Sequence, residues 1–496
     1  MNKYTQGIML TAMMACAVPL ACATDMLDSA SSAGKQLLER WRTPDAPKPA
    51  RPMPPDVPAH WRSAFVADEE FNCDVWLAEL GARDKPALLL VHGLGQNGSK
   101  DWRKAIAALE ADYRIVLVDL PGFGYSDKPA KKLSPTAFAQ LLHRLKQRLL
   151  PNEAWAVVGH SMGGAVSLRY AQLYPGDVAQ LVLVDAAGIL QRTAFVKHSA
   201  DGQVDVDLDR LPNSLIGYAA NLQDLGSALI EKLLTIPDPT SLLTHSDKAW
   251  GITLAKTPNL NAALALAEED FSQAVHATRL KTSIIWGEKD PVAPLRTGQV
   301  LAHALSNDRL SIIAGAEHVP MNSHPAEFNQ ALLAALTSAA APISPPAPLP
   351  AIVASAECNH AVGNVISGYY RLISIKGCKQ VNIVDAVAER VVIEDSLVSL
   401  HNLRVEAPQG AALSLRDSVI IGTNVQLSGE AALEATHSRV DLAGARLSGQ
   451  RLLMRSKGKS RVIMSVSEGV LGGTAHFLHG DFRLQDQRLE DVAGFK

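Results

Sequence analysis

The chain has 496 residues, a formal charge of −3 and 47% hydrophobic residues. Its length predicts more than one domain, and its composition is that of a globular protein with enough apolar residues for a large core. Because basic residues are not in excess, we expect no nucleic-acid partner.

The first residues are typical of an export signal. A lysine near the start precedes a mostly apolar stretch, 7–20, which is too short to span a bilayer. Ala21-Cys22-Ala23 then forms a small-x-small cleavage site. We therefore predict a signal peptide over 1–23, a mature start near Thr24 and an exported protein, periplasmic or secreted. The alternative is a lipid anchor at Cys22, and we expect membrane contact only in that case.

A long segment of alternating strands and helices follows a proline-rich tether, 24–62. Two short opening strands are expected at 64–66 and 73–77. Continuous apolar runs, typical of strands that are buried on both faces, occur at 87–91, 114–119, 155–158, 180–185, 282–287 and 309–313. Helical patterns separate them at 102–109, 136–150, 165–173 and 325–336. The segment 63–338 is therefore predicted to form a doubly wound, mostly parallel α/β sheet.

Residues 190–278 interrupt this alternation and are predicted to form a helical cap over the sheet. Helical patches occur at 225–234 and 260–271, without a strong buried strand. Several apolar residues there either line an acyl pocket or form the core of the cap itself: Leu229, Ile230, Leu233, Leu234 and Leu266.

A G-x-S-x-G motif, Gly159-His160-Ser161-Met162-Gly163, stands between a predicted strand and a predicted helix. In that context the motif forms a sharp turn that lifts the serine hydroxyl clear of the sheet. Ser161 is therefore the candidate nucleophile. A serine hydroxyl is weakly nucleophilic at neutral pH and needs an adjacent base.

The ordered set of motifs resembles the α/β-hydrolase superfamily, specifically its serine hydrolases with a helical cap. The matching segments are His92-Gly93, 119–126, the Ser161 turn, 286–290 and 315–318. The family order of nucleophile, acid and base implies Ser161, Asp290 and His318 as the catalytic triad. The resemblance also implies an oxyanion hole formed by the backbone N–H groups of Leu94 and Met162.

Other residues remain alternatives at this site. Glu288 and Asp185 are rival acids, and His324 is a rival base, although its place before Pro325 is explained by the start of a helix. His92 and His160 are interpreted as structural. No Cys/His set has metal-ligand spacing, so we expect no metal and no cofactor.

A second region follows a proline-rich linker, 339–351. Residues 352–496 are predicted to form an all-β domain with internal repeats: 411–429 aligns with 431–449, and 391–396 aligns with 413–418. Such a period favours a β-solenoid, similar to a parallel β-helix. It would bind a surface polymer, mediate self-association or only support the enzyme.

The cysteines beyond the signal peptide fit an oxidising compartment. Cys358 and Cys378 lie in the same late region, and we expect them to form a disulfide, which leaves Cys73 as a buried thiol.

These features together predict an exported serine hydrolase that cleaves small-molecule carboxylic esters through an acyl-enzyme intermediate. A C–C bond hydrolase or a lipase would use the same triad. A different alternative is a surface-binding protein whose hydrolase domain is vestigial.

Overall fold

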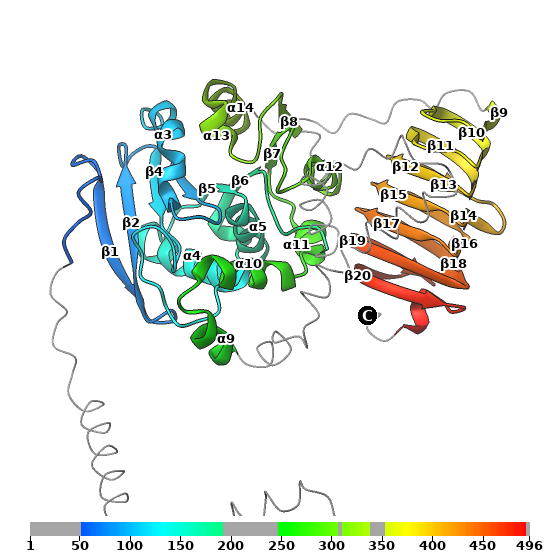
Figure 1. The fold of residues 1–496 in the computed structure, drawn as a ribbon. Coiled ribbons are helices and arrows are strands. Elements are labelled where there is room, and N and C mark those ends of the chain that lie inside the picture. Colours follow the sequence, from blue (N-terminus) through cyan, green and yellow to red (C-terminus); the bar gives the residue numbers. More distant parts are fainter. Residues whose placement is uncertain (1–50, 192–246, 306–309, 338–352, 493–496) are drawn as a thin grey trace, which may run out of the picture. The chain divides into compact units, whose positions relative to one another are not determined.

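The computed structural model describes residues 51–191, 247–305, 310–337 and 353–492 (Figure 1). Within these ranges no helix has the length and apolar character needed to cross a membrane. Several predictions lie outside the described residues: the signal peptide 1–23, most of the tether, the linker 339–351, the patch 225–234, Leu229, Ile230, Leu233 and Leu234.

An eight-stranded sheet forms the first part of the fold, in the order β1-β2-β4-β3-β5-β6-β7-β8. Its strands are β1 (Arg62–Asp68), β2 (Cys73–Leu80), β3 (Ala87–Val91), β4 (Arg114–Val118), β5 (Trp155–His160), β6 (Val178–Val184), β7 (Thr282–Gly287) and β8 (Leu310–Ile313). The strands from β3 to β8 pair in parallel, while β2 is antiparallel to both of its neighbours, β1 and β4. The predicted α/β fold with a mostly parallel sheet is confirmed.

Helices lie on both faces of this sheet. They are η2 (Gly98–Trp102), α3 (Arg103–Leu109), α4 (Pro135–Leu149), α5 (Met162–Leu173), η3 (Pro175–Asp177), α9 (Asp247–Leu254), α10 (Pro258–Glu268), α11 (Ser272–Ala277), α12 (Leu295–Ala304), α13 (Pro320–Ser323) and α14 (Pro325–Thr337). The helices α4, α5 and α12 contribute to one core cluster, and α3 and α14 to another.

Successive residues of each central strand enter these two cores in turn. Leu89 and Val91 of β3 join one core, whereas Leu88 and Leu90 join the other. This alternation explains why the strands are apolar at nearly every position, since neither face meets water.

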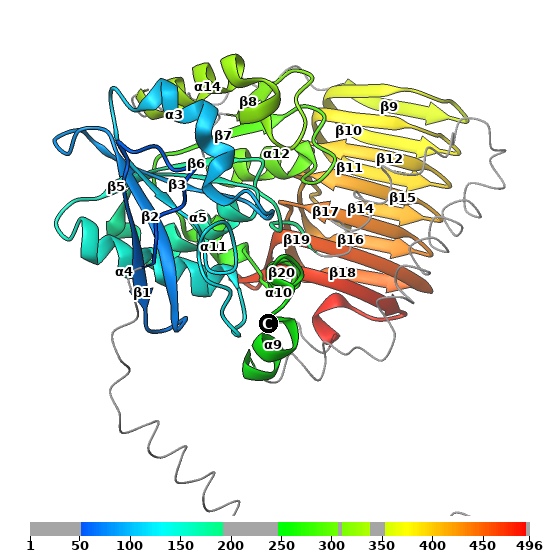
Figure 2. The same cartoon turned by 60° about the vertical axis from the view of Figure 1, so that its left-hand side comes forward.

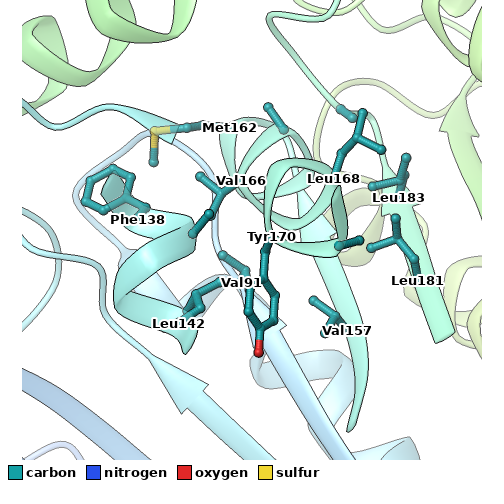
Figure 3. Packing of buried hydrophobic residues seen from close by; sticks show 14 of the residues in the cluster. Val91, Phe138, Leu142, Val157, Met162, Val166, Leu168, Tyr170, Leu181 and Leu183 are labelled. Atoms are coloured by element: carbon teal, nitrogen blue, oxygen red, sulfur yellow. The ribbon is translucent and has the colours of Figure 1, made fainter. Parts of the chain in front are cut away.

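Helix α5 is the most deeply enclosed of these helices. Ten of its twelve residues are buried, and Figure 3 shows Val166 and Tyr170 packed among side chains of α4 and the sheet. Burying one large apolar side chain contributes about 1.5–3 kcal/mol. The helix that begins directly after Ser161 is therefore held rigidly by its surroundings.

In the described part of the predicted cap, the side chain of Asn261 in α10 makes three hydrogen bonds. Its Oδ1 accepts hydrogen bonds from the Leu133 N–H at 3.0 Å and from Trp250 Nε1 at 2.7 Å. Its Nδ2 donates to the Lys131 carbonyl at 2.9 Å. Leu266 of the same helix is buried in the main core, so its contact with that core is observed and an acyl-pocket role is not needed to explain it.

The second part of the fold is all-β, and its strands pair mostly in parallel (Figure 2). They are β9 (Val353–Asn359), β10 (Val365–Lys376), β11 (Val381–Glu394), β12 (Leu397–His401), β13 (Arg404–Glu406), β14 (Ala411–Arg416), β15 (Val419–Thr423), β16 (Gln426–Thr436), β17 (Arg439–Ala443), β18 (Arg446–Lys457), β19 (Lys459–Leu471) and β20 (Thr474–Gln485), followed by η5 (Leu489–Asp491). Only β20 pairs antiparallel in this sheet, against β19.

Residues aligned by the sequence repeats are ladder partners in this domain. Ala411 pairs with Ala431 at the 20-residue shift, and Val391 pairs with Leu413 at the 22-residue shift. The repeat length in the sequence is therefore the number of residues between paired positions on neighbouring strands.

A column of buried serines reinforces the ladder. The N–H groups of Ser396, Ser418 and Ser438 each donate to the hydroxyl of the next serine at 3.2 Å, and the column ends at Ser460. Each bond satisfies a buried amide at a corner where strand pairing stops. The expected Cys358–Cys378 disulfide is also present, and Cys73 is a buried thiol in β2.

Residues Pro55–Lys496 form one compact unit, in which helix α12 contacts the all-β domain. Arg296 of α12 donates to Asp441 at 2.9 Å and to the Thr423 hydroxyl at 2.9 Å. Ala443 and Val466 of the all-β domain are buried in the same core cluster as the helices of the sheet. The all-β domain is therefore packed against the helix that follows the Asp290 loop.

Candidate active site

Ser161 stands at the turn between β5 and α5, and its backbone is left-handed, with φ 55° and ψ −123°. This conformation is uncommon for a residue with a side chain and is sustained only where the surroundings over-determine it. The Ser161 N–H donates to the Val184 carbonyl at 3.0 Å, and the Ser161 carbonyl accepts from Gly164 at 2.9 Å and Ala187 at 3.2 Å. The predicted turn is therefore formed and fastened to the neighbouring strand.

Close backbone contacts explain the glycines around Ser161. A Cβ on Gly159 would lie 2.3 Å from the Gly163 carbonyl oxygen, and a Cβ on Gly163 would lie 2.4 Å from the carbonyl oxygens of Val91 and His92. A Cβ on Gly93 would lie 2.7 Å from the Cβ of Ser161. No side chain fits at these three positions without movement of the main chain.

His318 lies between Ser161 and Asp290. Its Nε2 is 2.9 Å from the Ser161 hydroxyl, and its Nδ1 is 2.7 Å from Asp290 Oδ2. The three residues follow the ends of β5, β7 and β8, which are parallel strands of one sheet. Ser161 is 157 residues from His318 in the sequence, and Asp290 is 28 residues from it. Ser161 and Asp290 are buried.

The turn after β7 fixes the orientation of Asp290. Its Oδ1 accepts from the N–H groups of Val292 at 2.7 Å and Ala293 at 2.9 Å. Trp286 Nε1 donates to the Ala293 carbonyl at 3.0 Å and holds the same turn. Oδ2 is thereby directed to the histidine, and the Nδ1 of His318 is the donor in that bond.

His160 holds the main chain of His318 in place, a contact that the sequence did not predict. Its Nε2 donates to the main-chain carbonyl of His318 at 2.7 Å. Complete burial and the nearby His318 lower the pKa of His160 to about 3. His160 is therefore neutral near pH 7. The sequence signal for its role was its position inside the G-x-S-x-G motif.

Among the rival groups, Asp185 is the one beside the triad. It is fully buried, and its Oδ1 accepts from the Gly287 N–H at 2.8 Å. Burial and the adjacent Asp290 carboxylate raise the pKa of Asp185 well above its usual range. Glu288 instead accepts from the Gly315 N–H at 2.7 Å, and His324 contacts Ser323 at 3.0 Å.

The predicted oxyanion donors belong to segments that adjoin Ser161: Met162 follows it in the chain, and Leu94 follows Gly93, where a Cβ would lie 2.7 Å from the Cβ of Ser161. Met162 is the first residue of α5, where unpaired N–H groups and the helix dipole favour a negative charge. Leu94 lies in the loop after β3, whose shape is held by His92: its Nδ1 donates to the Gly93 carbonyl at 2.7 Å, and its Nε2 accepts from the Leu120 N–H at 3.0 Å.

Helix α10 also contacts this loop, through a residue that the sequence did not point to. Gly95 donates its N–H to Oδ1 of Asn259 in α10, at 3.0 Å. No motif marks Asn259, because the two residues are 164 positions apart.

Across the described ranges, no group of three His, Cys, Asp or Glu side chains has the arrangement of a metal site.

Comparisons with known proteins show which family the chain resembles. The model of the alpha/beta hydrolase fold matches residues 86–325. Lipase 3 of a Moraxella species is 30% identical over 235 residues, which cover 47% of this chain and 72% of the lipase. A 2-hydroxy-6-oxononadienedioate hydrolase of a Pseudomonas species is 24% identical, over 54% of this chain and 93% of that enzyme. The structure of a Pseudomonas aeruginosa hydrolase aligns with 56% of this chain and 99% of its own, at 20% identity and a TM-score of 0.40.

Proposed function

Because the chain belongs to the alpha/beta hydrolase family and is consistent with an ester hydrolase, we propose that it is a serine hydrolase that cleaves carboxylic esters through an acyl-enzyme intermediate. One observation carries this proposal: a continuous line of hydrogen bonds from the Ser161 hydroxyl through His318 to Asp290. It supports the role of Ser161 as nucleophile.

In the proposed mechanism His318 takes the proton of Ser161 as the hydroxyl attacks the ester carbonyl carbon. Asp290 stabilises the resulting imidazolium and keeps its ring oriented. His318 then gives the proton to the leaving alcohol. A water molecule, activated by the same histidine, hydrolyses the acyl-enzyme in the second half of the reaction.

The oxyanion of each tetrahedral intermediate would be bound by the N–H groups of Met162 and Leu94. Such donors act on charge that develops only during reaction, and removing one costs about 3 kcal/mol in known cases. Because the donors are main-chain groups, side-chain substitutions at these two positions would affect the rate less than disruption of the loop.

A lipase or a C–C bond hydrolase would use the same triad, so both substrate classes stay in the test. The chain is similar to a lipase and to a 2-hydroxy-6-oxononadienedioate hydrolase. We favour ester cleavage because the identity to the lipase, 30%, exceeds the 24% identity to the 2-hydroxy-6-oxononadienedioate hydrolase. A vestigial hydrolase domain would leave the side chains in place without turnover.

The test is hydrolysis of p-nitrophenyl esters over a range of acyl lengths by the full chain and by Ser161→Ala. We expect turnover in the first, loss of at least about 10³-fold in the second, and covalent labelling of Ser161 by a fluorophosphonate. Equal turnover by Ser161→Ala would disprove the proposal. Turnover confined to long acyl chains would identify a lipase, and the absence of both labelling and turnover would support a binding role.

We further propose that the protein is exported, with 1–23 as its signal peptide, and that 352–496 is a β-solenoid. The parallel ladders at repeat spacing support the second part. The solenoid would bind a surface polymer or a second copy of the chain. Mass spectrometry of the mature N-terminus separates cleavage before Thr24 from lipidation at Cys22.

A further inference from the structure

Asp185 is fixed between two strands beside the candidate triad. It follows the last residue of β6 with a left-handed backbone, φ 44°, and its N–H donates to the Ile285 carbonyl of β7 at 3.1 Å. Its side chain has no exposed surface. The carboxyl group therefore cannot reach water unless the ends of β6 and β7 move apart.

The two carboxyl oxygens of Asp185 have different hydrogen-bonding surroundings. Oδ1 accepts from the Gly287 N–H at 2.8 Å. Oδ2 is buried with no hydrogen-bond partner among the described residues, and the Asp290 carboxyl is near enough for its charge to act on Asp185. Asp119 is another buried acid, and each of its oxygens accepts a hydrogen bond. Its Oδ1 accepts from the Ser99 N–H and its Oδ2 from the Tyr125 N–H, both at 2.7 Å.

Two ionised carboxylates side by side in a buried site repel each other, and one of them without a donor on an oxygen is also poorly solvated. A single proton between them removes both penalties, because the protonated oxygen becomes a donor to the other acid. Asp290 already accepts two main-chain N–H groups and faces His318. The proton is therefore better placed on Asp185.

We propose that Asp185 is protonated and donates its O–H to the Asp290 carboxylate, so that the pair carries one negative charge and Asp290 stays directed at His318. This inference rests on the proposed function, in which Asp290 orients the base. Asp185 is a positioning residue, since it would act through Asp290 and would not touch the substrate.

The electrostatic surroundings agree with this assignment. Burial, and then the charge of Asp290, raise the pKa of Asp185. His318, at 2.7 Å, and His160, whose pKa burial lowers, are titratable groups that also interact with Asp290. The neutral form of His160 brings no positive charge that would ionise Asp185.

Two substitutions separate the proton donor from the mere presence of a side chain. Asp185→Asn keeps the shape and can donate an amide N–H to Asp290, so we expect kcat to fall less than about threefold. Asp185→Ala removes the donor and frees Asp290, and we expect kcat to fall about tenfold or more with KM little changed. A residue that only fills space would show no such rescue by asparagine.

The decisive measurement is infrared difference spectroscopy at neutral pH, which detects the carbonyl stretch of a protonated carboxylic acid. We expect this band in the wild-type protein and its loss in Asp185→Asn. Asp68→Asn is the matched control, because Asp68 is also buried but, despite the opposing effect of burial, hydrogen bonds from Arg144 lower its pKa. The control should therefore leave the band unchanged.

Stability supplies a second readout. The folded state retains a proton that the unfolded chain loses above about pH 4, so raising the pH disfavours the folded wild type relative to Asp185→Asn. The ratio of their unfolding constants should change by about tenfold per pH unit until Asp185 ionises. A ratio that does not change with pH, or a band that survives in Asp185→Asn, would overturn the proposal.

Neither readout depends on turnover, so failure of the proposed function is recognised separately by Ser161→Ala and fluorophosphonate labelling. If Asp185→Asn does not fold, Asp290→Asn decides. The band must then shift or disappear, because the Asp185 proton loses both its carboxylate acceptor and the negative charge that helps to retain it, and an unshifted band contradicts the pairing.

Discussion

His160 donates a 2.7 Å hydrogen bond from Nε2 to the main-chain carbonyl of His318, so the residue that precedes the candidate nucleophile holds the loop of the candidate base. The two rings lie 5.1 Å apart, centroid to centroid. The turn of Ser161 and the loop of His318 are therefore joined by two hydrogen bonds. One links the Ser161 and His318 side chains, and the other links His160 Nε2 to the His318 carbonyl.

The support predicts a kinetic effect of substitutions at His160. His160→Ala leaves the carbonyl of His318 without its donor and allows the loop to move, so we expect kcat to fall about tenfold. His160→Gln places an amide N–H near the position of Nε2 and should recover part of the loss. Steady-state ester hydrolysis measures both. Equal rates in wild type and His160→Ala would show that the bond does not position His318.

His160 also predicts an acid-dependent loss of stability. The pKa of this group falls from 6.5 to about 3 on folding, chiefly because of burial. The unfolded state therefore binds more protons below about pH 6.5, and stability is lost as the pH falls from there towards 3. Between neutral pH and about pH 5 we expect a loss of about 2 kcal/mol that His160→Gln does not show. Urea unfolding at the two pH values measures the difference, and parallel losses in both proteins would contradict it.

The glycines of the Ser161 turn predict a contrast in stability. Gly163→Ala would place a Cβ 2.4 Å from two carbonyl oxygens, whereas a Cβ on Gly176 would meet nothing within 4 Å. We expect Gly163→Ala to destabilise the fold by about 2 kcal/mol or more and to reduce turnover. Gly176→Ala should change stability by less than about 0.5 kcal/mol. Thermal unfolding of the two variants measures this contrast, and equal effects would show that the turn can relax.

The α/β architecture could be predicted from the sequence because it depends on local signals that agree. Strands such as 87–91 are apolar at every position, since alternate residues enter two cores, and the turn at Ser161 has its glycines at fixed offsets. The repeat spacing likewise matched the ladder partners, as Ala411 and Ala431 show.

Relationships across long sequence distances could not be predicted in this way. Asn259 contacts the loop after β3 through one side-chain oxygen, and no local pattern marks it. Asp185 was visible only as a rival to Asp290, because the sequence does not show that two strand ends bring both acids together. The contact of Arg296 with Asp441 joins two regions with unrelated patterns.

The acid of the candidate triad predicts a large kinetic effect with a close control. Asp290→Asn keeps the shape of the side chain but loses the carboxylate that accepts from His318 Nδ1, so the ring loses its preferred tautomer. Comparable substitutions lower kcat about 10⁴-fold, and we expect a loss of at least about 10³-fold. Glu288→Gln, two residues away, retains an acceptor for the Gly315 N–H and should change kcat less than about twofold. A larger effect at Glu288 than at Asp290 would reassign the acid.

The ion pair between Arg296 and Asp441 predicts an effect on stability and on turnover. Both side chains are largely buried, at 17% and 14% exposure, and Arg296 also donates to the hydroxyl of Thr423. Arg296→Ala would leave a largely buried carboxylate without its partner, which costs about 2–3 kcal/mol, somewhat less than for a fully buried pair. Arg404→Ala breaks an exposed pair with Glu406 and should cost less than about 0.5 kcal/mol.

A double-mutant cycle with Asp441→Asn tests whether the cost comes from the pair itself. We expect a coupling of about 1 kcal/mol or more, because residues in one hydrogen-bond network are not additive. Helix α12 follows the turn that holds Asp290, so Arg296→Ala should also lower kcat, whereas Arg404→Ala should not. Independent effects of the two substitutions would mean that apolar contacts such as those of Val466, and not the ion pair, hold the all-β domain against α12.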